Sequence, residues 1–416
     1  MNLSLLIPSR NNLDFLKLAY SSIRKNQGNH HVEILVLDDK SDKDNTWEWC
    51  ENIMGFDLDF TAFKNNRSER LGISSGYKFL SQQATQEVIC HWHADMVMTE
   101  GTFDAIEAEL FDGMKSIGFV ENRKKVVCLT RIEPPIYNDA GVYPEKIIWA
   151  DAPIEIEDWN ESFFTAKLPH LIKSWGGKKT GGHFAPFFMF TKQYLELGSN
   201  DTITFPKQAR EDSCWGFRLV LAGFETIQIP HMVFHFASRG NRRSKDNSGS
   251  WKDSPEWEEI NEKSTRNFIR KWGTFHPLHD EFLKPRKPKV YNIGFILQNP
   301  SFDLIHALEP WCSRMVCPTL DQQIINRYIE LEQPTTPFNL TEKLEYGGCE
   351  TDIIVEIDGQ RFSQNDYQTI QYLSQIIEES GEVGEFQLGN LKITIKSLQT
   401  YEHELIVCKN EPISLN

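Results

Sequence analysis

The chain has 416 residues, of which 44 are lysine or arginine and 59 are aspartate or glutamate, for a formal net charge of -15. With 40% hydrophobic and 25% charged residues it has the profile of a soluble globular protein, and its length predicts two domains, with room for a third. The acidic balance disfavours a protein that holds DNA or RNA through a broad basic face, but it is compatible with a local basic pocket for a phosphorylated ligand.

The first hundred residues alternate between apolar, strand-like runs and segments with helical spacing. We expect strands at residues 3–8, 32–37, 56–63 and 88–92, with helices between them at 13–23, 46–53 and 71–80. This order is typical of a parallel sheet covered on both faces, in which ligands bind beyond the carboxyl ends of the strands. Polar clusters follow three of these strands, at residues 8–12, 38–44 and 93–95.

The middle of the chain continues the mixed α/β pattern after an irregular polar stretch. We expect a strand at residues 126–132, an apolar run at 184–190, a helix at 210–222, a strand pair at 226–236 and a helix at 255–272. Gly273 follows the last of these helices as the expected C-cap glycine.

Prolines in a charged stretch predict a linker at residues 276–289. The linker divides the chain into a first domain at 1–275 and a second, smaller α/β domain at 290–416. In the second domain we expect strands at 290–297, 352–357, 391–395 and 404–408, and helices at 304–311 and 364–379. This domain carries no nucleophile, phosphate-loop or metal signature, so its role stays open.

Cysteine usage and hydropathy bear on the compartment. The eight cysteines are scattered without a CxxC pair, which is typical of reduced, mostly buried thiols in a cytosol-like setting. No apolar run approaches the ~18 residues that a membrane span needs, and no cationic segment precedes the first strand. We therefore expect a cytoplasmic protein without a transmembrane segment.

Two of the polar clusters offer ligand-binding groups. The carboxylates of Asp38 and Asp39 suit a nucleobase N–H or a ribose hydroxyl, although a turn that caps the next helix explains the pair equally well. His93 and Asp95, at i and i+2, can point the same way and converge on one ion. Oxygen ligands suit Mg²⁺ or Mn²⁺ and imidazole favours Mn²⁺. The alternative is a turn aspartate beside a core histidine.

Carboxylates and cations recur later in this domain. Glu211 and Asp212 open the helix at 210–222, either as caps favoured by the helix dipole or as a general base that faces a cleft. His235 ends a strand and precedes the densest basic cluster of the domain, which is either a solvated loop or a cover for a diphosphate. The cations of this cluster are Arg239, Arg242 and Arg243.

Several other enzyme classes lack their signatures. No GxGxxG follows the first strand, the glycine-rich stretch at residues 176–182 is not a Walker A loop, and no GxSxG or HExxH occurs. Dehydrogenase, P-loop nucleotidase, serine hydrolase and zinc protease are therefore disfavoured.

Taken in order, these pieces resemble the family 2 glycosyltransferases of GT-A fold. The resemblance covers about residues 1–240 and implies a Rossmann-like, nucleotide-diphospho-sugar transferase domain. More loosely, the whole chain is similar to uncharacterised glycosyltransferases of large phages and other DNA viruses, which implies a viral protein in the host cytoplasm. The matching runs are Leu5-Leu6-Ile7-Pro8-Ser9-Arg10-Asn11, Val36-Leu37-Asp38-Asp39-Lys40-Ser41, Arg70-Leu71-Gly72-Ile73-Ser74-Ser75-Gly76, His93-Ala94-Asp95, Glu211-Asp212 with Arg218 and Gly223-Phe224, and His235.

The resemblance implies a role for each matching residue. Asp95 would hold a divalent metal, Mn²⁺ or Mg²⁺, together with His235 and with His93, which stands where the family has its first aspartate. Asp212, beside Glu211, would be the general base of an inverting displacement. The donor would be held by Pro8, Arg10, Asp38, Asp39, Arg70 and Gly72, and its departing diphosphate by Arg239, Arg242 and Arg243. Candidates to stack on the acceptor sugar are Trp149, Trp215 and Phe187.

These roles predict a metal-dependent, inverting glycosyltransferase that moves a sugar from a nucleotide-sugar donor to a hydroxyl acceptor. The donor is expected to be a UDP-sugar, because the Asp39 position often meets uracil in the family, and the acceptor is expected to be a glycan. A non-catalytic nucleotide-sugar or glycan-binding relative, a GT-A-like nucleotidyltransferase and a transferase acting on modified DNA bases stay open as alternatives. A homodimer through the second domain also stays open.

Overall fold

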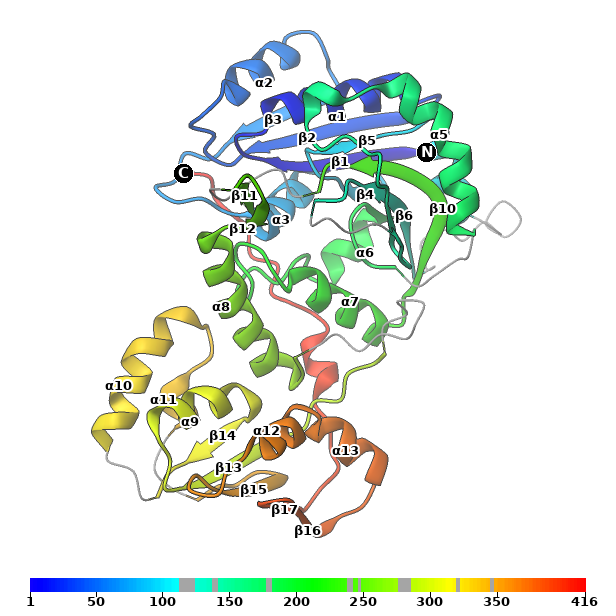
Figure 1. Cartoon of the computed structure of the whole chain (residues 1–416). Helices are drawn as coiled ribbons and strands as arrows, with labels where there is room; N and C mark the ends of the chain where they lie inside the picture. The colour runs from blue at the N-terminus through cyan, green and yellow to red at the C-terminus, as the bar shows by residue number, and fades with distance from the viewer. Residues whose placement is uncertain are drawn as a thin grey trace.

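The computed structural model describes residues 1–111, 124–136, 141–176, 182–237, 242–245, 248–275, 286–318, 322–344 and 348–416. They form two units, each built on its own β-sheet, with one long helix lying between them (Figure 1). Within these ranges no helix has the length and apolar character that crossing a bilayer requires. All eight cysteines are free and six of them are buried, as the sequence predicts.

The first unit contains a mixed sheet with the strand order β3-β2-β1-β4-β9-β6-β10-β5. The strands β1 to β4 pair in parallel, β9 runs antiparallel between β4 and β6, and β5 pairs antiparallel with the end of β10. This arrangement confirms the predicted α/β class. The strands are β1 (Asn2–Ser9), β2 (His31–Asp38), β3 (Phe60–Lys64), β4 (Val88–His91), β5 (Met96–Val97), β6 (Lys125–Glu133), β7 (Gly141–Val142), β8 (Lys146–Ile148), β9 (Phe187–Phe190) and β10 (Glu225–His235).

Alternation along β1 explains why helices cover both faces of this sheet. Leu3, Leu5 and Ile7 point to one face and pack with α1, α2 and α4, whereas Leu6 points to the other face and packs with α3, α6 and α7. The helices are α1 (Leu13–Asn26), α2 (Thr46–Met54), α3 (Ile73–Gln83), α4 (Thr102–Leu110), α5 (Glu161–Trp175), α6 (Thr191–Glu196) and α7 (Glu211–Leu221), with a 3₁₀ turn at Ile156–Asp158.

The strand pair predicted at residues 226–236 is instead the single strand β10. Its register against β6 shifts between Ile229 and Met232, around Pro230. Proline has no N–H to donate to the ladder, so the sequence pattern suggests that one strand ends there and a second begins. In the structure a bulge accommodates the proline and the strand continues. A hairpin of β11 (Arg243–Lys245) and β12 (Trp251–Asp253) follows.

The helix α8 (Pro255–Trp272) has strong signals at both ends. Ser254 accepts a hydrogen bond from the backbone N–H of Trp257, Pro255 occupies the first turn, and Gly273 ends the helix with φ +64. The expected C-cap glycine is confirmed. Phe268 and Trp272 pack against α7, while Ile269 packs into the core of the second unit. The helix is therefore shared by both units.

The second unit is built on a sheet ordered β14-β13-β15-β17-β16, with a parallel half around β13 and an antiparallel half around β17. The strands are β13 (Ile293–Gln298), β14 (Arg314–Val316), β15 (Ile353–Asp358), β16 (Gly384–Leu388) and β17 (Leu391–Ile395). The helices are α9 (Phe302–Leu308), α10 (Gln322–Glu332), α11 (Leu340–Lys343), α12 (Gln364–Gln371) and α13 (Leu373–Ser380), with 3₁₀ turns at Glu309–Trp311, Gln333–Thr335 and Glu402–Leu405.

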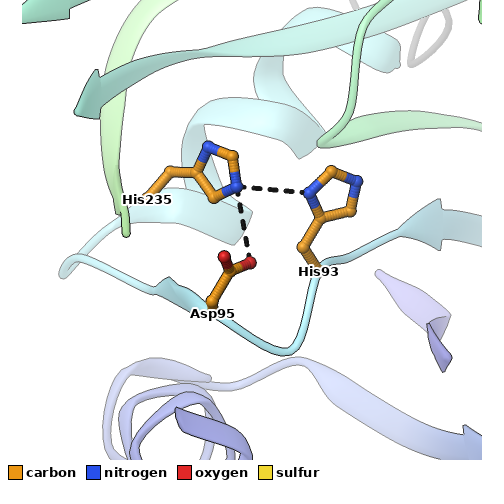
Figure 2. Close-up of side chains that lie close together, drawn as sticks. All are labelled: His93, Asp95 and His235. Carbon is orange, nitrogen blue, oxygen red and sulfur yellow. Dashed lines mark hydrogen bonds and ion pairs between the residues drawn. The ribbon is translucent and has the colours of Figure 1, made fainter. Parts of the chain in front are cut away.

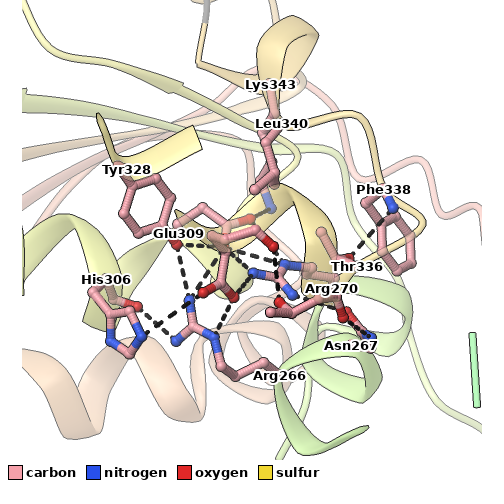
Figure 3. A network of polar contacts seen from close by, with 12 residues as sticks. Arg266, Asn267, Arg270, His306, Glu309, Tyr328, Thr336, Phe338, Leu340 and Lys343 are labelled. Atoms are coloured by element: carbon pink, nitrogen blue, oxygen red, sulfur yellow. Dashed lines mark hydrogen bonds and ion pairs between the residues drawn. The ribbon is translucent and has the colours of Figure 1, made fainter. Parts of the chain in front are cut away.

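A buried ionic network joins α8 to this unit (Figure 3). The carboxylate of Glu309, which is fully buried, accepts hydrogen bonds from Arg270, from Lys343 at 2.7 Å and from the Tyr328 hydroxyl at 3.0 Å. Arg266 and Arg270 also both bond the carboxylate of Glu332, at 2.7 and 2.5 Å. Because three cations surround two carboxylates, each charge in the joint has a partner.

After β17 the chain returns to the first unit, where residues 406–415 run toward β3 (Figure 1). The strand predicted at residues 404–408 is wrong, because this segment contains the end of a 3₁₀ turn, then a bend, and pairs with no strand. Its backbone hydrogen bonds go instead to side chains and carbonyls of the first unit.

Candidate active site

A cleft of about 570 Å³ opens beyond the carboxyl ends of β1, β2 and β4. The segments that follow these strands line it, together with the start of α7 and the end of β10. A doubly wound sheet binds its ligands at this place, and the volume is that of a small-molecule site. The predicted site residues that line the cleft are Pro8, Arg10, Asp39, Arg70, Gly72, His93, Asp95, Phe187, Glu211, Asp212, Trp215, His235, Arg242 and Arg243.

Two predicted residues that the structure describes, Asp38 and Trp149, are not among those that line the cleft. Asp38 is buried at the end of β2, where it accepts a hydrogen bond from the backbone N–H of Ser41 at 3.0 Å, so it has the turn role and not the donor role. Trp149 is buried and stacks on Phe163, with ring centroids 5.7 Å apart. Arg239 lies outside the described residues.

Histidine and carboxylate side chains meet on one side of the cleft (Figure 2). Nε2 of His235 lies 3.3 Å from Nδ1 of His93 and 3.4 Å from a carboxylate oxygen of Asp95. The three candidate ligand atoms all lie within 4.8 Å of one another. The antiparallel pairing of β5 with β10 makes this contact, because it sets His235 opposite Met96. The structure thus brings together the three residues that the sequence analysis names as candidate metal ligands.

Glu133 holds His235 from behind and was missed by the sequence analysis. Its carboxylate lies 2.9 Å from Nδ1 of His235, at the end of β6. If Nδ1 donates its proton to Glu133, Nε2 is left with a lone pair that faces His93 and Asp95. Arg131 and Lys146 also pair with Glu133. The sequence feature that could have identified Glu133 is a carboxylate at the end of a strand. The strand expected at residues 126–132 ends one residue before it.

Burial and neighbouring charges set the protonation of this cluster. Burial, with His235 alongside, lowers the pKa of His93 to about 4, so its ring is neutral at physiological pH. Burial alone would lower the pKa of His235, but Asp95 and Glu133 outweigh it and raise the value. Burial opposes ionisation of Glu133, yet Arg131, His235 and Lys146 hold its pKa well below the usual range.

The carboxylates at the start of α7, Glu211 and Asp212, line the same cleft. Both residues before the helix, Ala209 and Arg210, adopt left-handed conformations with φ +67, a strained geometry for non-glycine residues that is concentrated at functional sites. One oxygen of Glu211 is buried and lacks a hydrogen-bond partner among the described residues. Burial and the adjacent Asp212 raise the pKa of Glu211 to about 8. Asp212 is exposed and accepts a hydrogen bond from the Ser213 backbone at 2.6 Å.

On the donor side, Asp39 organises the loop at residues 65–72, which we call the 65–72 loop. One oxygen of Asp39 accepts from the Asn65 side chain at 2.6 Å and the Leu71 N–H at 2.9 Å, and the other accepts from the Gly72 N–H at 2.8 Å. Gly72 has φ +81, and a Cβ there would lie 2.5 Å from the Cα of Lys207, so only glycine fits. Three of the roughly four acceptor positions of Asp39 are thus occupied by this loop.

Two of the predicted cations that line the cleft, Arg70 and Arg242, already have acidic partners. Arg70 pairs with Glu256 of α8 at 3.0 Å, and Arg242 pairs with Asp253 at 3.1 Å while it stacks over Trp257. These partners belong to α8 and to the β11–β12 hairpin, so both elements hold cationic side chains at the cleft.

Arg218, which fits the family pattern, does not reach the cleft. It is fully buried, and its guanidinium donates to the backbone carbonyls of Leu197, of Ser199 at 2.6 Å and of Ile406 at 2.7 Å. Its role is therefore structural. The aromatic and imidazole groups that line the cleft without having been predicted are Tyr77, His91, His183, Phe184 and Trp257.

The parallel β1–β4 core, the antiparallel β9 and β5, and a cleft at the switch point define a GT-A nucleotide-sugar transferase fold. Residues 4–163 match the family model described as glycosyl transferase family 2. This match confirms the family resemblance over that part of the chain, and no curated protein matches the chain.

Solved structures similar to this chain include the following three, all of low sequence identity. The crystal structure of GalNAc-T7 with UDP, GalNAc and Mn2+ has a TM-score of 0.40 and 13% identity, and the match covers 56% of this chain and 44% of that one. S. aureus TarS 1-349 has a TM-score of 0.36 and 15% identity, with 65% and 66% covered. Mannosyltransferase PcManGT from Pyrobaculum calidifontis, in complex with GDP-Man and Mn2+, has a TM-score of 0.39 and 15% identity, with 65% and 63% covered. The chain spans less than two thirds of the length of each of them.

Proposed function

We propose that the chain is a metal-dependent, inverting glycosyltransferase that moves a sugar from a nucleotide-sugar to an acceptor hydroxyl. One observation carries the proposal: a single cleft in a family 2 domain brings together the His93–Asp95–His235 cluster and the carboxylates at the start of α7. An inverting sugar transfer requires both groups. The leaving diphosphate needs a positive charge beside it, and the acceptor hydroxyl must lose a proton on the opposite face of the sugar.

The three side chains fit a divalent metal. Two imidazole nitrogens and one carboxylate oxygen face one another within 4.8 Å, and the low pKa of His93 leaves its ring neutral, which is the form that binds metals. The Glu133 carboxylate behind His235 is the partner that metal-binding histidines generally have. A divalent ion bound there would offset the charge that develops on the departing nucleoside diphosphate.

Asp212 is the proposed general base. It is exposed in the cleft, whereas the neighbouring Glu211 has a buried oxygen and a pKa raised to about 8, so that Glu211 stays protonated at neutral pH. Two adjacent carboxyl groups in different environments allow one to accept the acceptor's proton while the other stays neutral. The neutral Glu211 also spares Asp212 a second negative charge beside it.

The residues that line the cleft and the family resemblance together support the proposed donor and acceptor. The donor nucleotide would lie along Pro8, Arg10 and the 65–72 loop, and we keep a UDP-sugar as the proposed donor on the family resemblance at Asp39. The acceptor is proposed to be a glycan hydroxyl. Trp215 and Phe187, which line the cleft although both side chains are buried, stay the proposed aromatic contacts of the acceptor.

The test is nucleotide-sugar turnover over a panel of donors with Mn²⁺, Mg²⁺ or EDTA, for the wild type, Asp95→Ala and Asp212→Asn. We expect one donor to release nucleoside diphosphate in a metal-dependent way. Loss of the base should lower the rate ~10²–10⁴-fold, and Asp95→Ala should in addition weaken metal binding measured by calorimetry.

The matched control is Asp14→Asn, an exposed carboxylate on α1 whose side chain pairs with Lys17. It should leave turnover unchanged. Full activity in Asp212→Asn would place the base elsewhere, and donor binding without any turnover would favour the non-catalytic binding relative.

A further inference from the structure

The segment at residues 406–415, which we call the strap, leaves the second unit and crosses the first. In Figure 1 it is the red trace that rises from the second unit, passes α7 and ends near β3. Just before it, Tyr401 donates its N–H to the carbonyl of Val290, and Glu402 accepts from the Val290 N–H. The strap is thus tied to the second unit at one end and lies on the first along its length.

The strap is anchored first beside α7. Arg218 of α7 donates to the carbonyl of Ile406 at 2.7 Å, and the N–H of Cys408 donates to the carbonyl of Leu197 at 3.0 Å. Gly198 makes the close approach possible, because a Cβ at this residue would lie 1.9 Å from the carbonyl oxygen of Cys408. The helix that carries Glu211 and Asp212 therefore holds the strap through a fully buried side chain.

The strap then follows α3, the helix that begins directly after Gly72. The buried ammonium of Lys78 donates to the carbonyl of Lys409 at 2.7 Å. The Gln82 side chain donates to the Glu411 carbonyl at 3.1 Å and accepts from the Ile413 N–H at 3.2 Å. These bonds use side chains of α3 to satisfy backbone groups of the strap.

The end of the strap reaches the 65–72 loop. The carbonyl of Leu415 accepts from the N–H of Asn66 at 3.0 Å. The side chains of Ile413 and Leu415 pack against the core cluster that contains Leu71 and Tyr77. Asn66 is next to Asn65, whose side chain bonds Asp39, so the strap contacts the loop one residue away from the cleft's own hydrogen-bond network.

The strap therefore connects both walls of the cleft. On one wall is α7, with the proposed general base, and on the other is the 65–72 loop, which supplies Arg70 and Gly72 to the cleft. Apart from the strap, α8 also holds the loop from outside, because Glu256 pairs with Arg70 at 3.0 Å. The 65–72 loop places three hydrogen-bond donors on Asp39. If the strap did not hold the loop in this conformation, the loop would have to become ordered when the nucleotide binds, and the apparent affinity for the nucleotide would be lower.

We propose that the strap is a positioning element of the nucleotide pocket: it holds the 65–72 loop in its binding conformation and so sets the affinity for the donor nucleotide. The inference rests on the proposed function in one respect, namely that the ligand of the cleft contains a nucleoside diphosphate. It adds that the second unit contributes to the donor site through this segment.

The experiment uses full-length chains with Ile413→Asp and Leu415→Asp together, which put charge into the contact with the core cluster. We expect the dissociation constant for UDP in the presence of Mn²⁺, measured by calorimetry, to rise roughly tenfold, the result if the loop keeps its binding conformation about a tenth of the time. Amide exchange at Leu71 and Gly72 should quicken, while the thermal midpoint and near-UV circular dichroism stay close to those of the wild type.

Val407→Asp is the matched control, because Val407 lies on the same strap and is 60% exposed. It should bind UDP as the wild type does, and Leu415→Met should do the same. If the double variant does not fold, Gln82→Ala, which removes strap contacts from the outside of α3 without adding a charge, should raise the dissociation constant in its place.

Unchanged UDP affinity in a variant whose strap amides exchange freely would overturn the inference and leave the proposed function intact. A wild-type chain that binds neither UDP nor GDP, with or without Mn²⁺, would instead remove the nucleotide pocket and with it the proposed function. The two failures are thus distinguishable.

Discussion

Among single residues, Glu133 has the largest leverage on the histidine–aspartate cluster, because it fixes which nitrogen of His235 faces the cleft. Glu133→Gln removes the charge that favours a proton on Nδ1. We expect the affinity for Mn²⁺ alone to fall ~10–100-fold, as is typical when the partner of a metal-binding histidine is changed. Calorimetry without nucleotide measures this directly.

The control for this prediction is Glu145→Gln, since Glu145 lines the same cleft but contacts neither ring of the cluster in any interaction described. It should bind Mn²⁺ as the wild type does. Equal Mn²⁺ affinity in the wild type and Glu133→Gln would mean that His235 is oriented by the chain and not by this carboxylate.

The sequence could identify which types of side chain form the site, but not which of those side chains point into the cleft. Asp38 and Asp39 carry the same side chain at the same strand end, yet Asp38 is the last residue of β2 and turns inward, whereas Asp39 lines the cleft. The pattern of His93, Asp95 and His235 survives because strand pairing brings them together. Arg218 fits a family pattern and still lies in the interior, since its carbonyl partners come from two segments far apart in the chain, Leu197 and Ser199 in one and Ile406 in the other.

At the scale of elements, α8 is the helix on which the second unit depends, and Glu309 is the centre of their joint. Glu309→Gln would leave Arg266, Arg270 and Lys343 buried around one remaining carboxylate, Glu332. Breaking a buried pair in this way costs about 3–5 kcal/mol in the free energy of unfolding. Urea denaturation should show the loss, with Glu262→Gln, an exposed change on the same helix, close to neutral.

The same substitution predicts a pH dependence. Burial opposes ionisation of Glu309, but Lys343 and Arg270 hold its folded-state pKa well below the usual value. A lowered pKa means that the stabilisation is present above the unfolded value, near 4.5, and is lost as the pH falls toward the folded value. The difference between wild type and Glu309→Gln should therefore be full at neutral pH and shrink below about pH 4.5. A difference that stays constant would contradict the assignment.

Elements with local signals were predictable and elements set by distant partners were not. The caps of α8 are local, since they depend on Ser254, Pro255 and Gly273 alone, and the β1–β4 order follows from alternating apolar runs. The strand predicted at residues 404–408 fails because its apolar residues, such as Ile406, serve a surface of the first unit and not a ladder. Nothing within ten residues of Ile406 encodes that partner.

For the whole molecule, the prolines predict two domains joined by a linker at residues 276–289, of which 276–285 lie outside the described residues. In the part that the structure describes, the two units are tied at two places. One is α8, which buries Phe268 and Trp272 against the first unit and Ile269, Arg266 and Arg270 against the second. The other is the strap, which starts in the second unit and ends on the 65–72 loop. Both units pack against α8. When one unit unfolds and exposes its side of α8, the other unit loses contacts too, so the unfolding of the two units should be coupled.

We therefore expect a single calorimetric unfolding transition for the wild-type chain. A nucleotide that binds only the first unit should raise the temperature of the whole transition, because binding at about 100 times the dissociation constant adds ~2.7 kcal/mol to the folded state. Replacing Arg266 and Arg270 together by methionine should uncouple the units and split the transition, with UDP and Mn²⁺ shifting only one part. Two transitions in the wild type, of which the nucleotide moves one, would show that α8 and the strap hold the units together without making them one cooperative structure.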